Sequence, residues 1–286
     1  MNSGLVALAG RPNVGKSTIV NALCAEKVAI VSDKPQTTRR RIAGVWSGSE
    51  HQLVLIDLPG FQRPRDAMTE RMQQTVNASL EGIDAVLFVV AADEEIGSGD
   101  QFIARRVFAA EQPVVIALNK VDRVKPGQIA AQIERVAALG DFHALHPVSA
   151  KSGDGIEALR GELLELLPAG PALYPKDVVT DQTIEERVAE LVREQALHLT
   201  REELPHAVGV ELVEFSERRI SAAILVETES QKRIVVGAGG SMVKEIGSRA
   251  RKEIEALIGR AVFLELRVKV REGWRQRPHE LRRLGI

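Results

Sequence analysis

Short apolar runs alternate with segments of helical spacing along the first 165 residues of the chain. Because strands that alternate with helices pair in parallel and are covered by those helices, this pattern predicts an α/β domain with a mostly parallel sheet. The predicted strands are residues 5–9, 42–46, 52–58, 84–90, 114–118 and 145–148. The predicted helices are residues 18–25, 100–110 and 128–139. Residues 28–41 have no clean period, which predicts a loop that becomes ordered on demand.

The pattern changes near residue 168, where closely spaced prolines and Gly170 interrupt the helical spacing. We therefore predict a domain of residues 1–168, a linker of residues 169–180 and a second domain of residues 181–286. The second domain has the order helix, strand, strand, short helix, glycine loop, helix, strand, which predicts an α+β fold. These elements are residues 181–199, 209–215, 222–228, 232–236, 237–240, 241–259 and 261–270, with Asp181 and Ser241 as the expected N-caps.

A phosphate-binding motif follows the first predicted strand. Residues 10–17, with the sequence GRPNVGKS, fit G-x-x-x-x-G-K-[ST] and lie between an apolar run and an apolar-periodic segment. In this motif backbone N–H groups and the positive end of a helix dipole surround phosphate oxygens. Lys16 is expected to reach the terminal phosphates and the Ser17 hydroxyl to ligate Mg²⁺. The alternative is a glycine-rich turn that only joins a strand to a helix, and the four fixed positions in this context argue against it.

Composition places the chain among globular proteins, with 44% hydrophobic and 27% charged residues. A net charge of −1 excludes a global field that attracts nucleic acid, so any basic surface must be local. The N-terminus lacks signal-peptide features and no apolar run is long enough to span a bilayer, so a cytoplasmic protein is expected. The single cysteine, Cys24, cannot form an internal disulfide and is predicted to be a small buried side chain rather than a reactive thiol.

Further polar stretches follow the predicted strands. Asp57 to Gly60 ends one strand at the sheet edge where ligands bind, so Asp57 can hold Mg²⁺ through water and the Gly60 N–H can approach a γ-phosphate. In the preceding loop, Thr37 and Thr38 can supply a further Mg²⁺ ligand, as switch segments do. Residues 119–122 (NKVD) and 149–151 (SAK) follow two later strands.

These stretches, in this order, resemble the signature of translation-factor-type GTPase domains. The resemblance implies a Ras-like P-loop fold, GTP hydrolysis, and GTP or GDP with Mg²⁺ as ligands. It implies that Asp122 accepts two hydrogen bonds from guanine that adenine cannot donate, while Asn119 and the Ala150 N–H contact the other edge of the base. The expected nucleotide-binding residues are Gly10, Arg11, Pro12, Asn13, Val14, Gly15, Lys16, Ser17, Thr18, Asp57, Leu58, Pro59, Gly60, Phe61, Asn119, Lys120, Val121, Asp122, Ser149, Ala150 and Lys151. The expected metal ligands are Ser17, Thr37, Thr38 and Asp57, and the residues expected to act in hydrolysis are Lys16, Gly60, Thr38 and Asn13.

The hydrolytic position departs from that of the best-known small GTPases. Phe61 follows Gly60 where those proteins carry the glutamine that orients the attacking water, and a phenyl ring cannot do this. Asn13 matches an asparagine that some members of this hydrophobic subgroup use to hold K⁺ beside the phosphates. Such an ion would replace the charge of an arginine finger, so K⁺-stimulated hydrolysis is a hypothesis. The alternative is that Asn13 only holds the backbone of its loop.

The second half resembles a KH domain of the prokaryotic type, known as type II. In a KH fold the G-x-x-G loop lets a nucleic-acid backbone approach, and an adjacent groove holds about four nucleotides. A plain helix–helix turn is the alternative, and this loop lacks the lysine that such loops often carry. The tail from residue 267 has seven basic and two acidic residues and includes Trp274, which is expected to stack on a base; the alternative is a solvated tail with one packed tryptophan. The expected RNA-binding residues are Gly237, Ala238, Gly239, Gly240, Lys244, Arg271, Trp274, Arg275 and Arg277.

Together the two halves resemble the Era family of bacterial ribosome-assembly GTPases over nearly the whole chain. The resemblance rests on residues 35–39 (PQTTR), the linker residues 170–175, residues 203–206 (ELPH) and the KH segment. It implies binding to the 3′ end of small-subunit (16S) ribosomal RNA, a role in rRNA processing and 30S subunit biogenesis, a link to cell-cycle control and peripheral association with the inner face of the cell membrane. A monomer is expected.

Two other functions remain open from the sequence. One is a constitutive RNA-binding scaffold in which GTP is structural, and it predicts equal RNA affinity with GDP and with a non-hydrolysable GTP analogue. The other is a tRNA-modification GTPase, which shares the hydrophobic catalytic position. The absence of a C-terminal cysteine and the KH order of elements argue against the second alternative.

Overall fold

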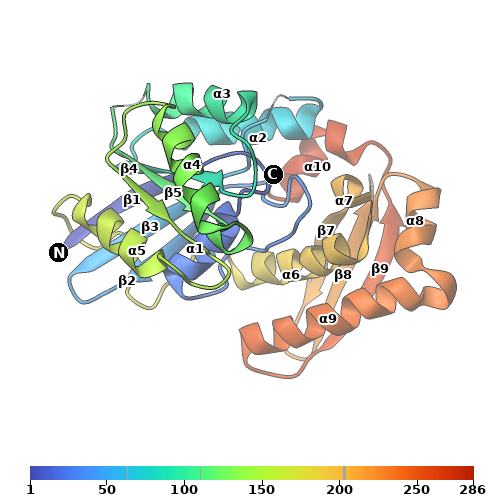
Figure 1. Cartoon of the computed structure of the whole chain (residues 1–286). Helices are drawn as coiled ribbons and strands as arrows, with labels where there is room; N and C mark the ends of the chain where they lie inside the picture. The colour runs from blue at the N-terminus through green and yellow to red at the C-terminus, as the bar shows by residue number, and fades with distance from the viewer. Residues whose placement is uncertain (63, 110, 202–203) are drawn as a thin grey trace. The chain divides into compact units, whose positions relative to one another are not determined.

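The computed structural model describes residues 1–62, 64–109, 111–201 and 204–286, and the chain forms two compact units (Figure 1). The first unit comprises residues 1–29, 38–63 and 72–181, and the second comprises residues 30–37, 64–71 and 182–286. The segment 169–180, predicted as a linker, is thus part of the first unit. Two loop segments of the predicted first domain, residues 30–37 and 64–71, belong to the second unit.

The first unit contains a six-stranded sheet in the order β2-β3-β1-β4-β5-β6. Its strands are β1 (Asn2–Ala9), β2 (Ile42–Ser47), β3 (His51–Asp57), β4 (Ala85–Ala91), β5 (Val114–Asn119) and β6 (Ala144–Pro147). Only β2 runs antiparallel to its neighbour; the other pairs are parallel, as the alternation of strands and helices predicts. β3 lies on one side of β1 and β4 on the other, so the end of β1 is a topological switch point, where open α/β sheets bind ligands.

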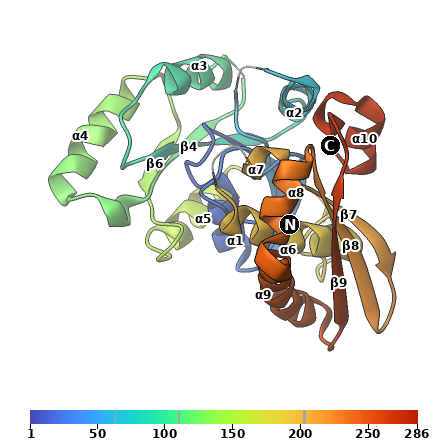
Figure 2. The same ribbon diagram turned by 90° about the vertical axis from the view of Figure 1, so that its right-hand side faces the viewer.

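Helices cover both faces of this sheet (Figures 1 and 2). One hydrophobic core lies under α1 (Lys16–Cys24) and α5 (Ile156–Glu165). A second core lies under α2 (Ala67–Ala78), α3 (Ser98–Val107) and α4 (Pro126–Ala137). Along β1, Val6 and Leu8 enter the first core while Ala7 and Ala9 enter the second, because successive side chains of a strand point to opposite faces.

The segment after α5 is attached to the first unit by Gln52, which is fully buried on β3. Its amide oxygen accepts the N–H groups of Leu173 and Tyr174 at 2.7 and 2.9 Å, and its amide nitrogen donates to the Tyr174 carbonyl at 2.8 Å. A buried amide with three hydrogen bonds fixes a loop more firmly than a flexible linker would allow.

The second unit has a three-stranded sheet in the order β7-β8-β9, with β7 antiparallel and β9 parallel to β8. Its strands are β7 (Gly209–Phe215), β8 (Arg219–Val226) and β9 (Phe263–Val270). Its core joins β8 to the helices α6 (Ile184–Leu199), α8 (Glu229–Val236) and α9 (Ser241–Ile258). Short elements complete the unit: α7 (Leu204–Ala207), η2 (Ala238–Gly240), η3 (Trp274–Gln276) and α10 (Pro278–Arg283).

The structure corrects both predicted helix caps. Thr183, not Asp181, caps α6, because its hydroxyl and the Glu186 side chain form a capping box two residues further on. The Asp181 carboxylate instead accepts the N–H of Ala43 at 2.9 Å. The N-cap of α9 is Gly240 in the left-handed conformation, and Ser241 is the first helical residue.

The helices α2, α5, α7 and α10 were not predicted, and two sequence features lie partly outside the described residues. The helix α2 was missed, although Met68, Met72 and Val76 recur at helical spacing and are buried. Residue 110, at the end of the helix predicted to begin at residue 100, is outside the described residues, as is Glu203 of the ELPH stretch.

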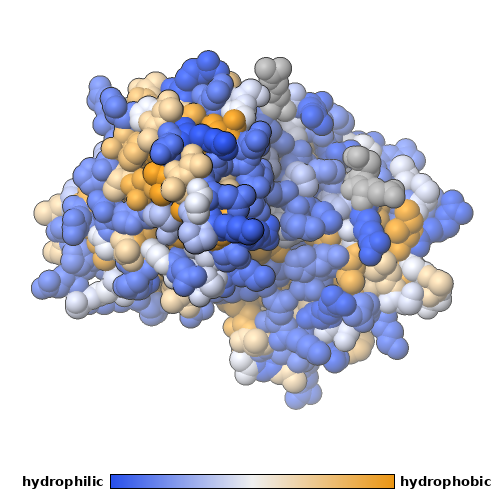
Figure 3. Space-filling model, viewed as in Figure 1, coloured by the Kyte–Doolittle hydropathy of each residue, from blue (hydrophilic) through white to orange (hydrophobic). Residues whose placement is uncertain are grey.

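Over the described ranges, no helix combines the length and apolar character that crossing a bilayer requires. The face drawn in Figure 3 is mainly hydrophilic where it is coloured, and its hydrophobic residues lie in small separate groups.

Candidate functional site

The loop between β1 and α1 places Lys16 at the centre of the candidate site. The Lys16 side chain is almost fully buried, and its ammonium donates to the carbonyls of Gly10 and Arg11 at 3.1 and 2.9 Å. Burial lowers the pKa of Lys16 to about 8, and the nearby negative charge of Asp57 opposes this shift. Two backbone carbonyls are weak partners for a buried cation, so this geometry leaves Lys16 ready to bind an anion such as a phosphate.

Two hydroxyls and one carboxylate meet beside this loop. The Ser17 hydroxyl donates to Asp57 Oδ2 at 2.6 Å and lies 2.9 Å from the Thr38 hydroxyl, which is 3.2 Å from the same carboxylate oxygen. Asp57 is fully buried, and its Oδ1 has no hydrogen-bond partner among the described residues. Burial raises the pKa of Asp57, and its hydrogen bond with Ser17 and the charge of Lys16 oppose the rise. A buried carboxylate beside two hydroxyls fits the oxygen ligands that Mg²⁺ prefers.

The two adjacent threonines, which the sequence left as alternatives, differ in their contacts. Thr38 joins the cluster with Ser17 and Asp57. The Thr37 hydroxyl instead donates to the Lys34 carbonyl at 2.7 Å, within its own loop. The geometry therefore favours Thr38 over Thr37 as a metal ligand.

The residues that the sequence predicts to contact the base lie at or just after the ends of β5 and β6. The Ser149 hydroxyl donates to Asp122 Oδ1 at 2.7 Å and orients this exposed carboxylate. Asn119, which is almost fully buried, donates to the Val14 carbonyl at 2.9 Å and accepts the Ala150 N–H at 3.0 Å. Asn119 and the Ala150 N–H, which are expected to contact the same edge of the base, are thus bonded to each other. Asn119 also connects its own loop to the phosphate loop and to the loop of residues 149–151.

Phe61 is buried in the structure, whereas Asn13 is exposed. Phe61 is buried in the core under α2, α3 and α4, so its ring is part of the packing and cannot orient water. Asn13 is exposed at the tip of the phosphate loop, with a positive φ of 65° that asparagine tolerates better than most residues.

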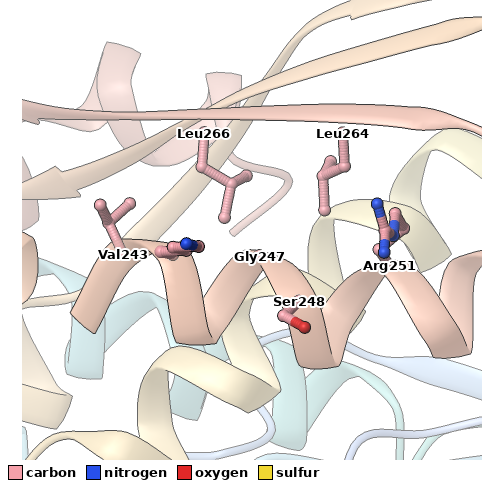
Figure 4. A pocket seen from close by; sticks show the side chains of 7 residues that line it. Val243, Gly247, Ser248, Arg251, Leu264 and Leu266 are labelled. Atoms are coloured by element: carbon pink, nitrogen blue, oxygen red, sulfur yellow. The ribbon is translucent and has the colours of Figure 1, made fainter. Parts of the chain in front are cut away.

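The second unit carries a groove between α9 and β9, with a volume of about 320 Å³ (Figure 4). Leu264 and Leu266 point from β9 toward the helix, and Gly247 on α9 leaves space beneath them. Arg251 lies at one end of the groove. The lining residues are Val243, Lys244, Gly247, Ser248, Arg251, Leu264 and Leu266. An apolar floor with cationic ends suits bases and their phosphates.

The loop of residues 237–240 lies between α8 and α9 of the same unit and begins the groove-lining helix. Gly237 has a φ of +74°, and a Cβ atom there would lie 2.7 Å from the backbone nitrogen of Met242. Only glycine fits such a position, so the sharp turn that the sequence predicted as G-x-x-G is required by the backbone.

Trp274 corrects a prediction. Its side chain has no exposed surface, and its indole N–H donates to the Ala207 carbonyl at 3.0 Å. It therefore packs inside the second unit and is not available to stack on a base, which is the alternative that the sequence left open.

Two of the predicted RNA-binding arginines are engaged in internal ion pairs. Arg271 pairs with Glu280 at 2.6 Å and with Glu211 at 3.3 Å, and Arg275 pairs with Glu227 at 2.7 Å. Of the predicted tail contacts, only Arg277 is exposed. The local excess of positive charge in the sequence is thus partly neutralised by Glu211 on β7, Glu227 just after β8 and Glu280 on α10.

Sequence reasoning missed several charged side chains that support these sites. Asp100 is fully buried and bonded to Arg11 of the phosphate loop. Arg193 and Glu194 are buried charged residues on α6. No local pattern distinguishes these residues from solvated charges. The one available signal is that Arg193 and Glu194 are consecutive charges directly after the apolar pair Leu191 and Val192.

Two family models match the chain. Residues 5–120 match the model described as 50S ribosome-binding GTPase, and residues 198–275 match the KH domain model. The two matches fall in the first and the second unit, apart from the segments 30–37 and 64–71 described above.

Two solved structures resemble the whole chain. One is a variant of Era from Aquifex aeolicus bound to GDP and AlF₄⁻, with 36% identity, coverage of 100% of this chain and 99% of the other, and a TM-score of 0.96. The second is Era in complex with MgGDPNP and nucleotides 1506–1542 of 16S ribosomal RNA, with 36% identity, the same coverage and a TM-score of 0.95.

Proposed function

The chain belongs to the Era family of GTPases, and on that premise we propose that it binds and hydrolyses GTP and binds the 3′ end of small-subunit ribosomal RNA in a nucleotide-dependent way. It thereby acts in rRNA processing and 30S subunit biogenesis. One observation carries the proposal: Thr38 meets Ser17 and Asp57, while the residue before it, Thr37, is bound by a helix of the second unit.

The first unit supplies the nucleotide site. The phosphate loop and Lys16 would bind the phosphates, Ser17 and Thr38 would ligate Mg²⁺, and Asp57 would hold it through water. The metal ion supplies charge stabilisation for phosphoryl transfer. Asp122, oriented by Ser149, would select guanine.

The segment 30–37 supports coupling between the nucleotide and the second unit, to which it belongs. Glu194 on α6 accepts the Val31 N–H at 2.8 Å, and the His198 ring contacts the Val31 carbonyl at 2.9 Å. Arg193 donates to the Thr37 carbonyl. Because Thr38 follows Thr37 directly, a ligand that fixes Thr38 also restrains the segment that α6 binds.

The segment 64–71, which follows Asp57 and Gly60 in the chain, supports the same coupling. The N–H of Ala67, at the start of α2, donates to the Gln276 side chain at 3.3 Å, and Asp66 pairs with Arg275 at 3.5 Å. A γ-phosphate that contacts the Gly60 N–H would therefore restrain the nearby residues Asp66 and Ala67, which the C-terminal tail binds.

The groove between α9 and β9, with the loop of residues 237–240, is the proposed RNA site. Lys244 and Arg251 bring positive charge to it, and both leucines offer apolar surface for bases. Arg277 would contribute from the tail, whereas Trp274 would act only in packing.

Threonine 38 provides the first test. Thr38→Ala removes the hydroxyl that meets Ser17 and is expected to lower GTP hydrolysis roughly 10- to 100-fold, the range for loss of a metal-supporting side chain. Thr37→Ala is the matched control, because that hydroxyl bonds only within its loop. Equal hydrolysis rates for the two variants would contradict the assignment of Thr38.

Arginine 251 provides the test of the groove. Arg251→Gln is expected to weaken binding of an RNA fragment from the 16S 3′ end and to reduce the slope of log affinity against log salt by about 1. Arg249→Gln is the control, because Arg249 pairs with Glu245 along the helix and does not line the groove. If the two variants bind RNA equally, the groove assignment is wrong.

Three expectations from the family resemblance are part of the same proposal. The protein would act in the cytoplasm with the ribosomal subunit, associate peripherally with the inner face of the cell membrane, and connect to cell-cycle control. A monomeric state is also expected.

A further inference from the structure

The first turn of α3, outside the five GTPase signature stretches, contains a buried carboxylate. Asp100, in the first turn of α3, has no exposed surface. Its Oδ2 accepts the Gly97 N–H at 3.0 Å, which fixes the carboxylate at the start of the helix. Its Oδ1 accepts the Arg11 Nε–H at 3.0 Å, so this carboxylate also binds the phosphate loop.

Arg11 uses its guanidinium for the protein rather than for a phosphate. Besides Asp100, it binds Glu94, with Nη2 2.6 Å from Oε2. A Cβ atom at position 99 would lie 2.8 Å from Arg11 Cδ, so the side chain is packed closely against α3. The Arg11 carbonyl accepts a hydrogen bond from the Lys16 ammonium at 2.9 Å, so the position of Arg11 affects the position of Lys16.

The same acidic segment reaches the base-recognition loop. Glu94 Oε1 lies 3.4 Å from Lys120 Nζ, and Asp93 Oδ1 lies at the same distance from that nitrogen. The other Asp93 oxygen pairs with Arg123 at 3.0 Å. Lys120 has a φ of 66°, a conformation that is uncommon for a residue other than glycine and that these ion pairs help to hold.

We propose that Asp93, Glu94 and Asp100, here called the acidic bridge, are positioning residues that hold the phosphate loop and the base-recognition loop at the separation that one guanine nucleotide spans. The inference rests on the proposed nucleotide site. Glu94 carries the link, because one of its oxygens faces Arg11 and the other faces Lys120. A site whose two ends are already spaced loses less entropy on binding, so the acidic bridge slows nucleotide release.

A structural role alone would give a different result. If Asp100 only capped α3, its loss would lower stability and leave the bound nucleotide unaffected. If the acidic bridge positions both loops, Arg11 and Glu94 act as one unit, and their substitutions are not independent.

The experiment measures the dissociation rate of a fluorescent GDP from the full-length protein with Mg²⁺. Glu94→Gln and Asp100→Asn are each expected to raise this rate roughly tenfold, at the lower end for loss of one charge-assisted hydrogen bond. The double variant Arg11→Gln with Glu94→Gln is expected to resemble the faster of its two single variants, since both changes break the same Arg11–Glu94 ion pair. Glu95→Gln, an exposed neighbour, is the control and keeps the wild-type rate.

The outcomes separate the inference from the proposed function. If the wild-type protein binds no GDP at micromolar concentration, the proposed function fails. If wild-type and Glu95→Gln proteins bind GDP and Glu94→Gln releases it at the same rate, the acidic bridge is refuted and the nucleotide site stands. The acidic bridge is also refuted if the rise in the GDP dissociation rate of the double variant equals the product of the rises in the two single variants. Glu94 is partly exposed, so its variant gives the test even if Asp100→Asn does not fold.

Discussion

Replacement of Asp122 by asparagine isolates the group that selects the base. In the structure the carboxylate stands at the end of β5, exposed, with Oδ1 held by the Ser149 hydroxyl at 2.7 Å. A guanine ring presents two donors, the N1–H and the exocyclic amine, to such a carboxylate. An asparagine keeps the shape but offers one acceptor and one donor, so one of the two hydrogen bonds becomes a clash of donors.

The size of the effect follows from these two bonds. A hydrogen bond to a charged group contributes about 1.5–3 kcal/mol, and the lower value suits an exposed carboxylate. Loss of one such bond, about 1.5 kcal/mol, and the donor left unsatisfied in its place, about 1–3 kcal/mol, together give about 3 kcal/mol, or roughly a 150-fold loss of GDP affinity. Xanthine has a carbonyl in place of the exocyclic amine, so it matches asparagine, and XDP is expected to gain affinity for the variant as GDP loses it.

The assay is competition of GDP, XDP and ADP against a fluorescent guanine nucleotide on the purified protein. Asp141→Asn, which removes another exposed carboxylate of the first unit, is the control and should leave all three affinities unchanged. GDP affinity of Asp122→Asn within about threefold of the wild type, with no gain for XDP, would refute the assignment of Asp122.

Two further predictions concern the metal and the tail. GTP hydrolysis is expected to be faster in K⁺ than in Na⁺ buffer, and Asn13→Ala should remove the difference, because Phe61 is part of the core and Asp100 and Glu94 hold Arg11, the arginine of the phosphate loop. Equal turnover of the wild-type protein in the two buffers would end that hypothesis. Trp274→Phe is expected to lower the free energy of unfolding by about 1–3 kcal/mol, because the buried Ala207 carbonyl loses its donor, measured by denaturant titration. RNA affinity of the folded variant should be unchanged, and a large loss would show that the indole contacts RNA after all.

The grouping of the residues of the proposed nucleotide site was predictable because they come in short contiguous stretches. Gly10 to Ser17 and Asn119 to Asp122 each carry several fixed positions at the end of an apolar run, and the parallel sheet brings those ends together. The choice between Thr37 and Thr38 was not predictable. It depends on which hydroxyl of an irregular loop faces Ser17, and no local pattern encodes that direction.

Burial of polar and aromatic side chains was the least predictable feature. Trp274 lies in a sequence rich in arginine, and the carbonyl that accepts its indole N–H belongs to Ala207, 67 residues away in the chain. Asp181 is a good capping residue by type, yet a capping box with Glu186 favours Thr183. For Trp274 a contact distant in the sequence decides, whereas for α6 the local capping box decides and Asp181 accepts the distant Ala43 N–H instead.

The central claim is that the bound nucleotide changes how the second unit binds RNA. It is tested most directly by titrating the full-length protein with an RNA fragment from the 16S 3′ end at fixed salt, once with GDP and once with a non-hydrolysable GTP analogue. If the bound nucleotide changes RNA binding by the second unit, RNA is expected to bind more tightly with the GTP analogue, by about 5- to 150-fold, the usual range of coupling between two sites. Arg193→Gln, which weakens the bond of α6 to the Thr37 carbonyl, should reduce that ratio. Equal affinities of the wild-type protein in the two nucleotide states would contradict the account and leave a constitutive RNA-binding scaffold.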